Sequence, residues 1–599
     1  MLIFTLILFL IITFSNPALF INDEWITANQ LHQLDIGHQV VYNEGKYGTF
    51  SNGTPSDYFK ARNNQLGYTL MLPVLSFPVL KLFGLFGDNF RYVVLLLWAT
   101  LPVITSIMVQ AFYPRQSKPF GIPVLYITLP VVLLLFIANL ANYTQFPFTA
   151  PDAPKEVAAI VFTQHILLAL TAVMIYKIFA LLTSDTRFSI FGLVATISCS
   201  SYLFWSGNAK DHLLLAFLLS LIIYFMLEFF IQKNTVNGLL AFFTTGIAMW
   251  ARVEVVLPIF VITAALYMIY IVKNRRNASQ TSFLVQLLAP LATIVGAIPY
   301  LLNNLYVMGN PFKPTVFAFS RVDVTPASPF NPASPIVDNA SATLPVESLN
   351  PASVIGQFGT FIASIVHFYL SVDWARLPID ALQVLVLPAS GNMGLLPVIP
   401  IFVFGVLLII FLRMKTTSLN AYVVLFLAGI SIAVIFSYMY ALGIMNNDDG
   451  IVPDMRYLSP MYLPLDILGL LMIWKTFEKE DWGIIARNVL GLFLIVAPVV
   501  TFSFYLLHPF GDDHNGFVTF FNVLIYGLLA ASIPACYLVA KDRADKKVLV
   551  TLMILLISLT FTWQMMELFI YAMAKFNGYN FWIPIIGQIY QSVFTVSGI

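Results

Sequence analysis

The sequence predicts an all-α protein that crosses a lipid bilayer about 15 times. Of its 599 residues, 59% are hydrophobic and only 10% are charged, and a soluble protein cannot bury so large an apolar fraction. The apolar residues form runs of about 20, the length that a helix needs to span the hydrocarbon core. A formal net charge of +1 excludes a nucleic-acid-binding protein, which would carry a basic surface.

The first predicted span covers residues 1–21. This run has no basic flank before it and no small-residue cleavage site after it, so it differs from a removable signal peptide. Roughly, the further predicted spans are 89–112, 121–142, 157–179, 188–206, 212–232, 236–250, 254–272, 281–306, 395–413, 420–442, 457–474, 487–508, 516–540 and 547–573. The run 66–86 contains two prolines, and we expect it to lie at the outer interface as a helix.

The placement of Lys and Arg decides the predicted topology. If 66–86 does not cross, all short basic loops lie on one side, which the positive-inside rule makes cytoplasmic. The longer loops 22–88, 143–156 and 307–394 then lie together outside, with the N-terminus inside and the C-terminus outside. If 66–86 crossed, no orientation would satisfy every basic loop.

This topology divides the chain into three regions. Residues 1–306 form an N-terminal transmembrane module, which includes the first outer loop 22–88 and carries most candidate catalytic groups. Residues 307–394 are rich in Pro, Ser and Asn, and we expect an extracytoplasmic loop region there. Residues 395–599 supply the C-terminal transmembrane helices and an outer tail.

Two adjacent acids, Asp23 and Glu24, end the first span. A carboxylate at the mouth of a membrane cavity can act as a general base, because partial desolvation raises its pKa toward neutrality. The alternative is an ordinary interfacial acid. Only one of two adjacent side chains needs to face a site, and we favour Asp23.

A third candidate acid, Asp152, lies in the Pro-rich second outer loop. Acids from separate loops could share a substrate, a proton or a divalent cation. The alternative is that the acids here only start the helix that follows. No motif requires a cofactor, and both cysteines lie in apolar runs, which excludes a Cys-based metal site.

Two cations interrupt the apolar runs. Lys210 lies in an outer turn, where pairing with Asp211 is the simpler alternative. Arg252 lies between two predicted spans, two residues before Glu254. Ionisable groups at membrane depth are costly, so a paired functional role is expected for Arg252, with a plain ion pair as the alternative.

Arg456 opens a predicted span at its outer end, within the segment Arg456-Tyr-Leu-Ser-Pro460. A guanidinium in this position can bind a phosphate through two parallel hydrogen bonds. The alternatives are snorkelling to the interface or a pair with Asp454.

Taken in order, these motifs resemble the GT-C superfamily of polyprenyl-phosphate-sugar-dependent glycosyltransferases. The likeness is to the branch of the protein O-mannosyltransferases and the lipid A aminoarabinose transferase. Four features carry it over most of the chain: Asp23-Glu24 after a single first span, an outer helix around Leu82-Phe83-Gly84 before a span led by Arg91, an acid in the second outer loop, and Arg456-Tyr-Leu-x-Pro late in the chain.

The resemblance implies a GT-C-like bundle and an inverting hexosyltransferase. Such an enzyme moves a sugar from a polyprenyl-phosphate carrier to an acceptor hydroxyl on the outer face. Asp23 would be the general base with Glu24 as neighbour or substitute, and Asp152 would orient the acceptor or the base. Arg456 would lie near the lipid phosphate, with Lys210 and Arg252 as further phosphate candidates that no family motif supports.

The resemblance has limits that leave alternatives open. The chain has no Trp-Trp-Asp-Tyr-Gly motif and no large soluble C-terminal domain, which argues against the oligosaccharyltransferase branch and leaves both a protein and a lipid-linked glycan as acceptors. A secondary transporter or flippase is the main alternative, although no internal repeat supports it. A non-catalytic scaffold subunit is the other.

Overall fold

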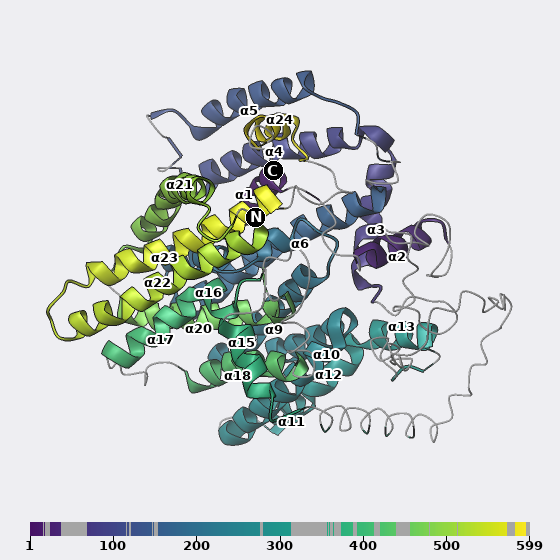
Figure 1. Ribbon diagram of the computed structural model, residues 1–599. Helices are drawn as coiled ribbons and strands as arrows, with labels where there is room; N and C mark the ends of the chain where they lie inside the picture. Colours follow the sequence, from purple (N-terminus) through teal and green to yellow (C-terminus); the bar gives the residue numbers. More distant parts are fainter. Residues whose placement is uncertain are drawn as a thin grey trace, which may run out of the picture.

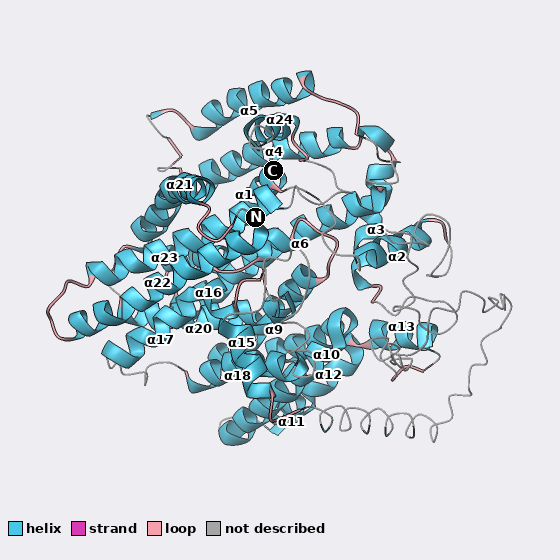
Figure 2. Ribbon diagram, viewed as in Figure 1, coloured by secondary structure: helices cyan, strands magenta, loops and turns pink. Residues whose placement is uncertain are grey.

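The computed structural model is built almost wholly of α-helices, which gather into a membrane-protein bundle (Figure 1). It describes residues 1–15, 17, 24–37, 69–114, 117–118, 121–146, 148, 154–275, 280–308, 310–312, 356, 359, 363, 370, 373–386, 392–412, 420–438, 454, 456–477, 480–511, 513–571 and 581–594. Within these ranges the only β pairing consists of isolated bridges, and Figure 2 shows helices joined by loops.

The N-terminal half contains the helices that carry most of the candidate site. They are α1 Leu2–Phe14, α2 Glu24–Asp35, α3 Met71–Gly84, η4 Gly87–Asn89, α4 Arg91–Phe112, α5 Val124–Ala141, α6 Lys155–Thr183, α7 Thr186–Ser198, α8 Tyr202–Trp205, α9 His212–Gln232, α10 Thr235–Asn274, α11 Gln280–Leu288, η7 Ala289–Leu291, α12 Ala292–Gly296 and α13 Ile298–Met308.

The C-terminal half completes the bundle. Its elements are α15 Leu377–Val386, α16 Leu395–Val398, α17 Pro400–Leu412, α18 Ala421–Tyr438, η11 Arg456–Met461, α20 Tyr462–Thr476, α21 Trp482–Leu507, α22 His514–Ala540, α23 Lys547–Met566, the π-helical turn η12 Glu567–Tyr571 and α24 Pro584–Phe594. Two of these, α15 and α24, were not predicted, since they fall in the expected outer region and outer tail.

Eleven helices of the described chain are long and apolar enough to cross a membrane, so the protein is an all-α polytopic membrane protein, as predicted. The predicted crossings 1–21, 188–206 and 395–413 fall on the shorter apolar helices α1, α7 and α17.

Helix α10 is a hairpin rather than one long rod. Its backbone leaves the helical region at Arg252, with φ −150° and ψ 90°. The ring of Tyr267 lies 5.0 Å from that of Phe242 and also against Gly238. In a straight helix Gly238 and Tyr267 would be about 43 Å apart, given a rise of about 1.5 Å per residue. The two halves therefore correspond to the separate spans predicted at 236–250 and 254–272.

The described residues of the first outer loop form the helices α2 and α3. Helix α3 is 14 residues long, about the same length as α1, α7 and α17, so its length does not decide whether 66–86 crosses, and the non-crossing run stays a prediction. The prediction of a loop at the start of 22–88 is wrong, because residues 24–35 form α2, which packs on α3 and α6. This packing buries Glu24, Gln30 and Gln33.

The C-terminal segment folds back onto the N-terminal half. The indole N–H of Trp582 donates to Nε2 of His165 on α6 at 3.2 Å. At the start of α24, which lies beside α5 (Figure 1), the backbone N–H of Ile585 donates to the side chain of Asn139 at 3.1 Å. The last described segment is thus joined to α5 and α6 of the N-terminal half.

Candidate functional site

Five chain segments meet at one end of the bundle. They are the N-terminal end of α9 with the turn before it, the bend of α10, the C-terminal end of α18, η11 at the start of α20, and the segment before α3. The last is fixed by a hydrogen bond from the hydroxyl of Thr69 to the carbonyl of Trp250 at the α10 bend.

The centre of this end is an ion pair between Asp211 and Arg252. Nε and Nη2 of Arg252 donate to the two carboxylate oxygens of Asp211 at 2.9 and 2.7 Å, and the two side chains are 10% and 9% exposed. Burial alone would raise the pKa of Asp211, but the charge and hydrogen bonds of Arg252, together with the charge of Lys210, lower it. Asp211 therefore stays ionised and fixes the guanidinium plane.

A pair of tyrosines joins Arg252 to Arg456. Nη1 of Arg252 donates to the hydroxyl of Tyr438 at 3.1 Å, and the Tyr438 and Tyr457 rings lie 5.2 Å apart. Both guanidinium groups lie over the ring of Tyr457, at 5.8 Å for Arg252 and 4.9 Å for Arg456. Residues 204 positions apart in sequence thus share one aromatic surface.

The predicted phosphate-binding residues Lys210, Arg252 and Arg456 come together around His212. The charges of all three act on its ring, whose centre lies 4.5 Å from that of the Trp205 ring with the two planes tilted by 52°. Lys210 is 2% exposed and His212 3%. Three cations share this end of the bundle with the carboxylates of Asp211 and Glu254. The cations outnumber these two acids, which makes this end a candidate anion site, and we refer to Lys210, Arg252 and Arg456 as the cation cluster.

Sequence reasoning missed the group that holds η11 in place. The buried carboxylate of Asp454 accepts hydrogen bonds from Ser201 at 2.7 Å, from the indole of Trp205 at 3.0 Å and from Tyr462. Burial raises the pKa of Asp454 although these three hydrogen bonds lower it. A sequence signal was present, because Asp454 lies two residues before Arg456. The sequence analysis considered Asp454 only as an ion-pair partner of Arg456.

Two of the predicted acids, Asp23 and Asp152, lie outside the described residues. The chain before Asp152 is held by Arg91, whose Nη1 donates to the carbonyl of Thr144 at 3.3 Å. The same guanidinium lies 5.3 Å from the centre of the Phe146 ring. Arg91 therefore ties the second outer loop to the start of α4.

Glu24, the neighbour of Asp23, is fully buried at the start of α2. The far end of α2, about 16 Å along its axis, binds the start of α6. There His32 contacts Glu156 at 2.9 Å, and Asp35 contacts Lys155 and Lys81. These contacts fix the orientation of the helix that Glu24 begins.

The described residues contain no group of three or more His, Cys, Asp or Glu side chains that could hold a metal ion. The divalent cation considered from the sequence would need Asp23 and Asp152, which lie outside these residues.

No protein-family model matches the chain, and no curated protein matches it. Solved structures do match. The chain is similar in structure to ArnT. The match to ArnT from Cupriavidus metallidurans bound to undecaprenyl phosphate covers 94% of this chain and 75% of ArnT, with 11% identity and a TM-score of 0.38. The match to its apo state has the same coverage and TM-score, with 12% identity.

Proposed function

We propose that the chain is an integral-membrane glycosyltransferase. It moves a hexose from a polyprenyl-phosphate carrier to an acceptor hydroxyl of a lipid-linked glycan or a protein, with inversion. The observation that carries this proposal is the cation cluster, whose members were chosen from the sequence as phosphate ligands. Arg252, which Asp211 binds, and Arg456 both lie over the ring of Tyr457, and Lys210 is next to Asp211 in the chain. The motifs shared with the GT-C superfamily supply the reaction class.

The chemistry of the leaving group explains why such a cluster would matter. In the transfer, the acceptor oxygen forms a bond to the anomeric carbon, and the bond from that carbon to the phosphate oxygen breaks. The electron pair leaves with the phosphate, whose charge rises from −1 in the sugar phosphodiester toward −2 in the monoester. Fixed cations bind this developing charge more tightly than the ground state, which lowers the barrier.

The acceptor proton needs a base on the opposite side of the sugar. We assign this role to Asp23, with Glu24 as its neighbour, and propose that Asp152 orients the acceptor or the base. A single displacement of this kind inverts the anomeric centre, because the acceptor attacks opposite the departing phosphate. Arg91 contacts Thr144, before Asp152 in the chain, and the α2–α6 contacts hold the helix that follows Asp23.

The site would face the outer side of the cell membrane. The short Lys- and Arg-rich loops lie at the other ends of the spans in the predicted topology, and the positive-inside rule makes those ends cytoplasmic. We therefore propose a cytoplasmic N-terminus and an extracytoplasmic site, which suits a carrier that presents its sugar outside.

A reconstitution experiment tests this function. The purified protein in liposomes receives radiolabelled polyprenyl-phosphate hexoses and a membrane extract that contains lipid-linked glycans. We expect label to appear in a glycan or protein acceptor, and Asp23→Asn to abolish this transfer while Arg487→Gln, at an exposed residue of α21, leaves it unchanged. Movement of intact labelled carrier across the bilayer without transfer would instead establish the transporter or flippase alternative.

A further inference from the structure

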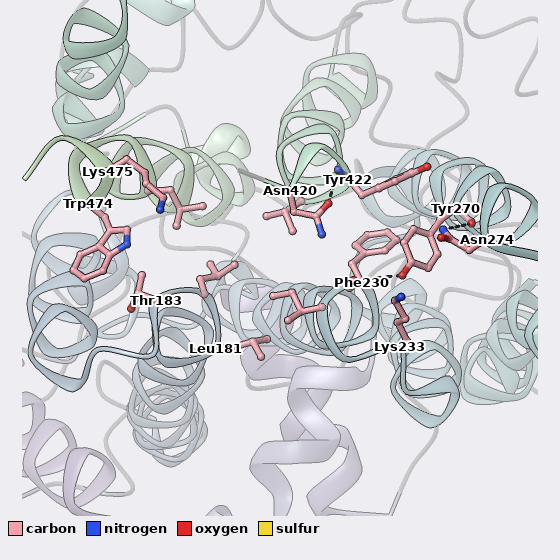
Figure 3. A pocket seen from close by; sticks show the side chains of 14 residues that line it. Leu181, Thr183, Phe230, Lys233, Tyr270, Asn274, Asn420, Tyr422, Trp474 and Lys475 are labelled. Atoms are coloured by element: carbon pink, nitrogen blue, oxygen red, sulfur yellow. Dashed lines mark hydrogen bonds between the residues drawn. The ribbon is translucent and has the colours of Figure 1, made fainter. Parts of the chain in front are cut away.

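A pocket lies at the opposite ends of the helices that carry the cation cluster. It has a volume of about 970 Å³ and is lined by the last residues of α6, α9, α10 and α20 and the first residues of α18. Figure 3 shows Lys233 and Lys475 reaching into it from different helices. Helix α9 has 21 residues, so the pocket is about 30 Å from the cation cluster.

The position of this pocket is that of a membrane–water interface. All of the helices that line it are apolar enough to span, and they end or begin at its wall. The aromatic side chains of Tyr270, Tyr422 and Trp474 line it as well, and Tyr and Trp are enriched where a span leaves the bilayer. Tyr270 and Tyr422 pack edge to face at 4.9 Å.

The chemistry of the lining is amphipathic and positive. Leu181, Phe230 and Leu471 form an apolar wall, whereas Lys233 and Lys475 supply two cations, and none of the described lining residues is acidic. A third cation lies close by, since Nζ of Lys273 is 6.0 Å from the centre of the Tyr422 ring. A ligand that matches this lining carries an anionic head next to apolar chains.

We propose that this pocket binds the phosphate headgroup of an anionic membrane lipid in the leaflet opposite the candidate active site. The volume lies within the range of pockets that enclose small ligands. The two lysines meet the phosphate, the apolar wall meets the upper acyl chains, and the amides of Asn274 and Asn420 at the rim can donate to headgroup oxygens. This site is separate from the transferase site and does not depend on the proposed reaction.

The competing explanation is that the lysines only serve helix ends. Lys233 is the C-cap of α9, with a left-handed φ of 60°, and Lys475 lies in the last turn of α20. Cations in such positions stabilise a helix by interacting with its terminal carbonyl groups. This explanation predicts that lysine removal lowers thermal stability without changing lipid binding.

The test measures lipid binding by native mass spectrometry of the full chain, with phosphatidylglycerol and phosphatidylcholine as probes. We compare the unmodified protein, the pocket variant Lys233→Gln/Lys475→Gln, and the control variant Lys541→Gln/Lys546→Gln, which removes two lysines from the α22–α23 connection on the same side of the bundle. A membrane-surface lysine contributes about fivefold to the binding of an anionic lipid, so the pocket variant should bind phosphatidylglycerol about 30-fold more weakly.

The proposal expects the control variant to bind phosphatidylglycerol as the unmodified protein does, and phosphatidylcholine to bind all three weakly. It also expects millimolar inorganic phosphate to leave lipid binding unchanged. Equal phosphatidylglycerol binding by the pocket and control variants, with both folded by thermal melting, would overturn it. Displacement of the lipid by inorganic phosphate would assign the pocket to a free anion and overturn it too.

Discussion

The Asp211–Arg252 pair gives the sharpest quantitative prediction. Asp211→Asn keeps the shape of the side chain but removes the negative charge that two hydrogen bonds of 2.7 and 2.9 Å join to the guanidinium. Both side chains are about nine-tenths buried, so water cannot replace the lost partner. Breaking a buried pair on one side costs about 3–5 kcal/mol of unfolding free energy, mostly because a charge is left uncompensated.

The double variant Asp211→Asn/Arg252→Gln removes both charges and should therefore be less destabilised than the sum of the single variants, by roughly 2–4 kcal/mol. A matched control exists in Arg187 and Asp481, which are joined at 3.0 Å but are 68% and 43% exposed. Solvent screens that pair, so its coupling energy should stay below about 1 kcal/mol.

The coupling energies can be measured by titrating each variant with sodium dodecyl sulfate in mixed micelles and following the helical circular dichroism signal. If the Asp211–Arg252 coupling is no larger than that of the Arg187–Asp481 control, the buried pair does not stabilise the fold as described. The rate of sugar transfer distinguishes an effect of these variants on catalysis from an effect on stability. The double variant should recover stability and still transfer about 100-fold more slowly, because the Arg252 charge is gone.

Three further predictions concern a closely packed glycine and two acids whose pKa values are shifted. A Cβ on Gly296 would lie 2.0 Å from the carbonyl oxygen of Phe243, so Gly296→Ala should cost about 1–3 kcal/mol in the same titration, whereas Gly491→Ala, with nothing within 4 Å, should not destabilise. Burial raises the pKa of Asp454 above 3.8, so the folded state keeps the proton to a higher pH than the unfolded state does. Stability should therefore fall as pH rises from 3.8 through the raised pKa. In Asp454→Asn the melting temperature should not change with pH for this reason. Asp35 has the opposite pH dependence, since despite burial Lys155 and Lys81 lower its pKa below 3.8. Its contribution to stability is present above pH 3.8 and is lost as pH falls through the lowered pKa. Asp35→Asn should therefore melt at a lower temperature than the unmodified protein at pH 7, and at the same temperature at a pH low enough to protonate Asp35.

The crossings could be predicted from sequence because hydropathy is a local property of each helix. Most predicted spans coincide with α4 to α10 and α18 to α23 within a few residues. The start of the first outer loop was missed because α2 is polar and lacks an apolar stripe. A signal was present, since residues 24–35 contain neither Pro nor Gly, as a helix interior requires.

The partners in the site were harder to predict than its cations. Lys210, Arg252 and Arg456 could be chosen because a charge at membrane depth is costly and needs a reason. The pairing of Asp211 with Arg252 instead depends on how α9 packs against the α10 hairpin. Because Lys210 is adjacent to Asp211 in sequence, the sequence analysis considered Lys210 as the partner of Asp211. The network of Asp454 joins residues about 250 positions apart, a distance at which a single sequence carries no pairing signal.

The measurement that most directly tests the central claim is the rate of sugar transfer from a radiolabelled polyprenyl-phosphate hexose by the Arg456→Gln variant, with Arg487→Gln as the control for lost positive charge. If Arg456 stabilises the departing phosphate, its variant should be slower by about 10²–10³-fold while remaining folded, and the control should match the unmodified protein. Equal rates for the two variants would contradict a phosphate site at the cation cluster.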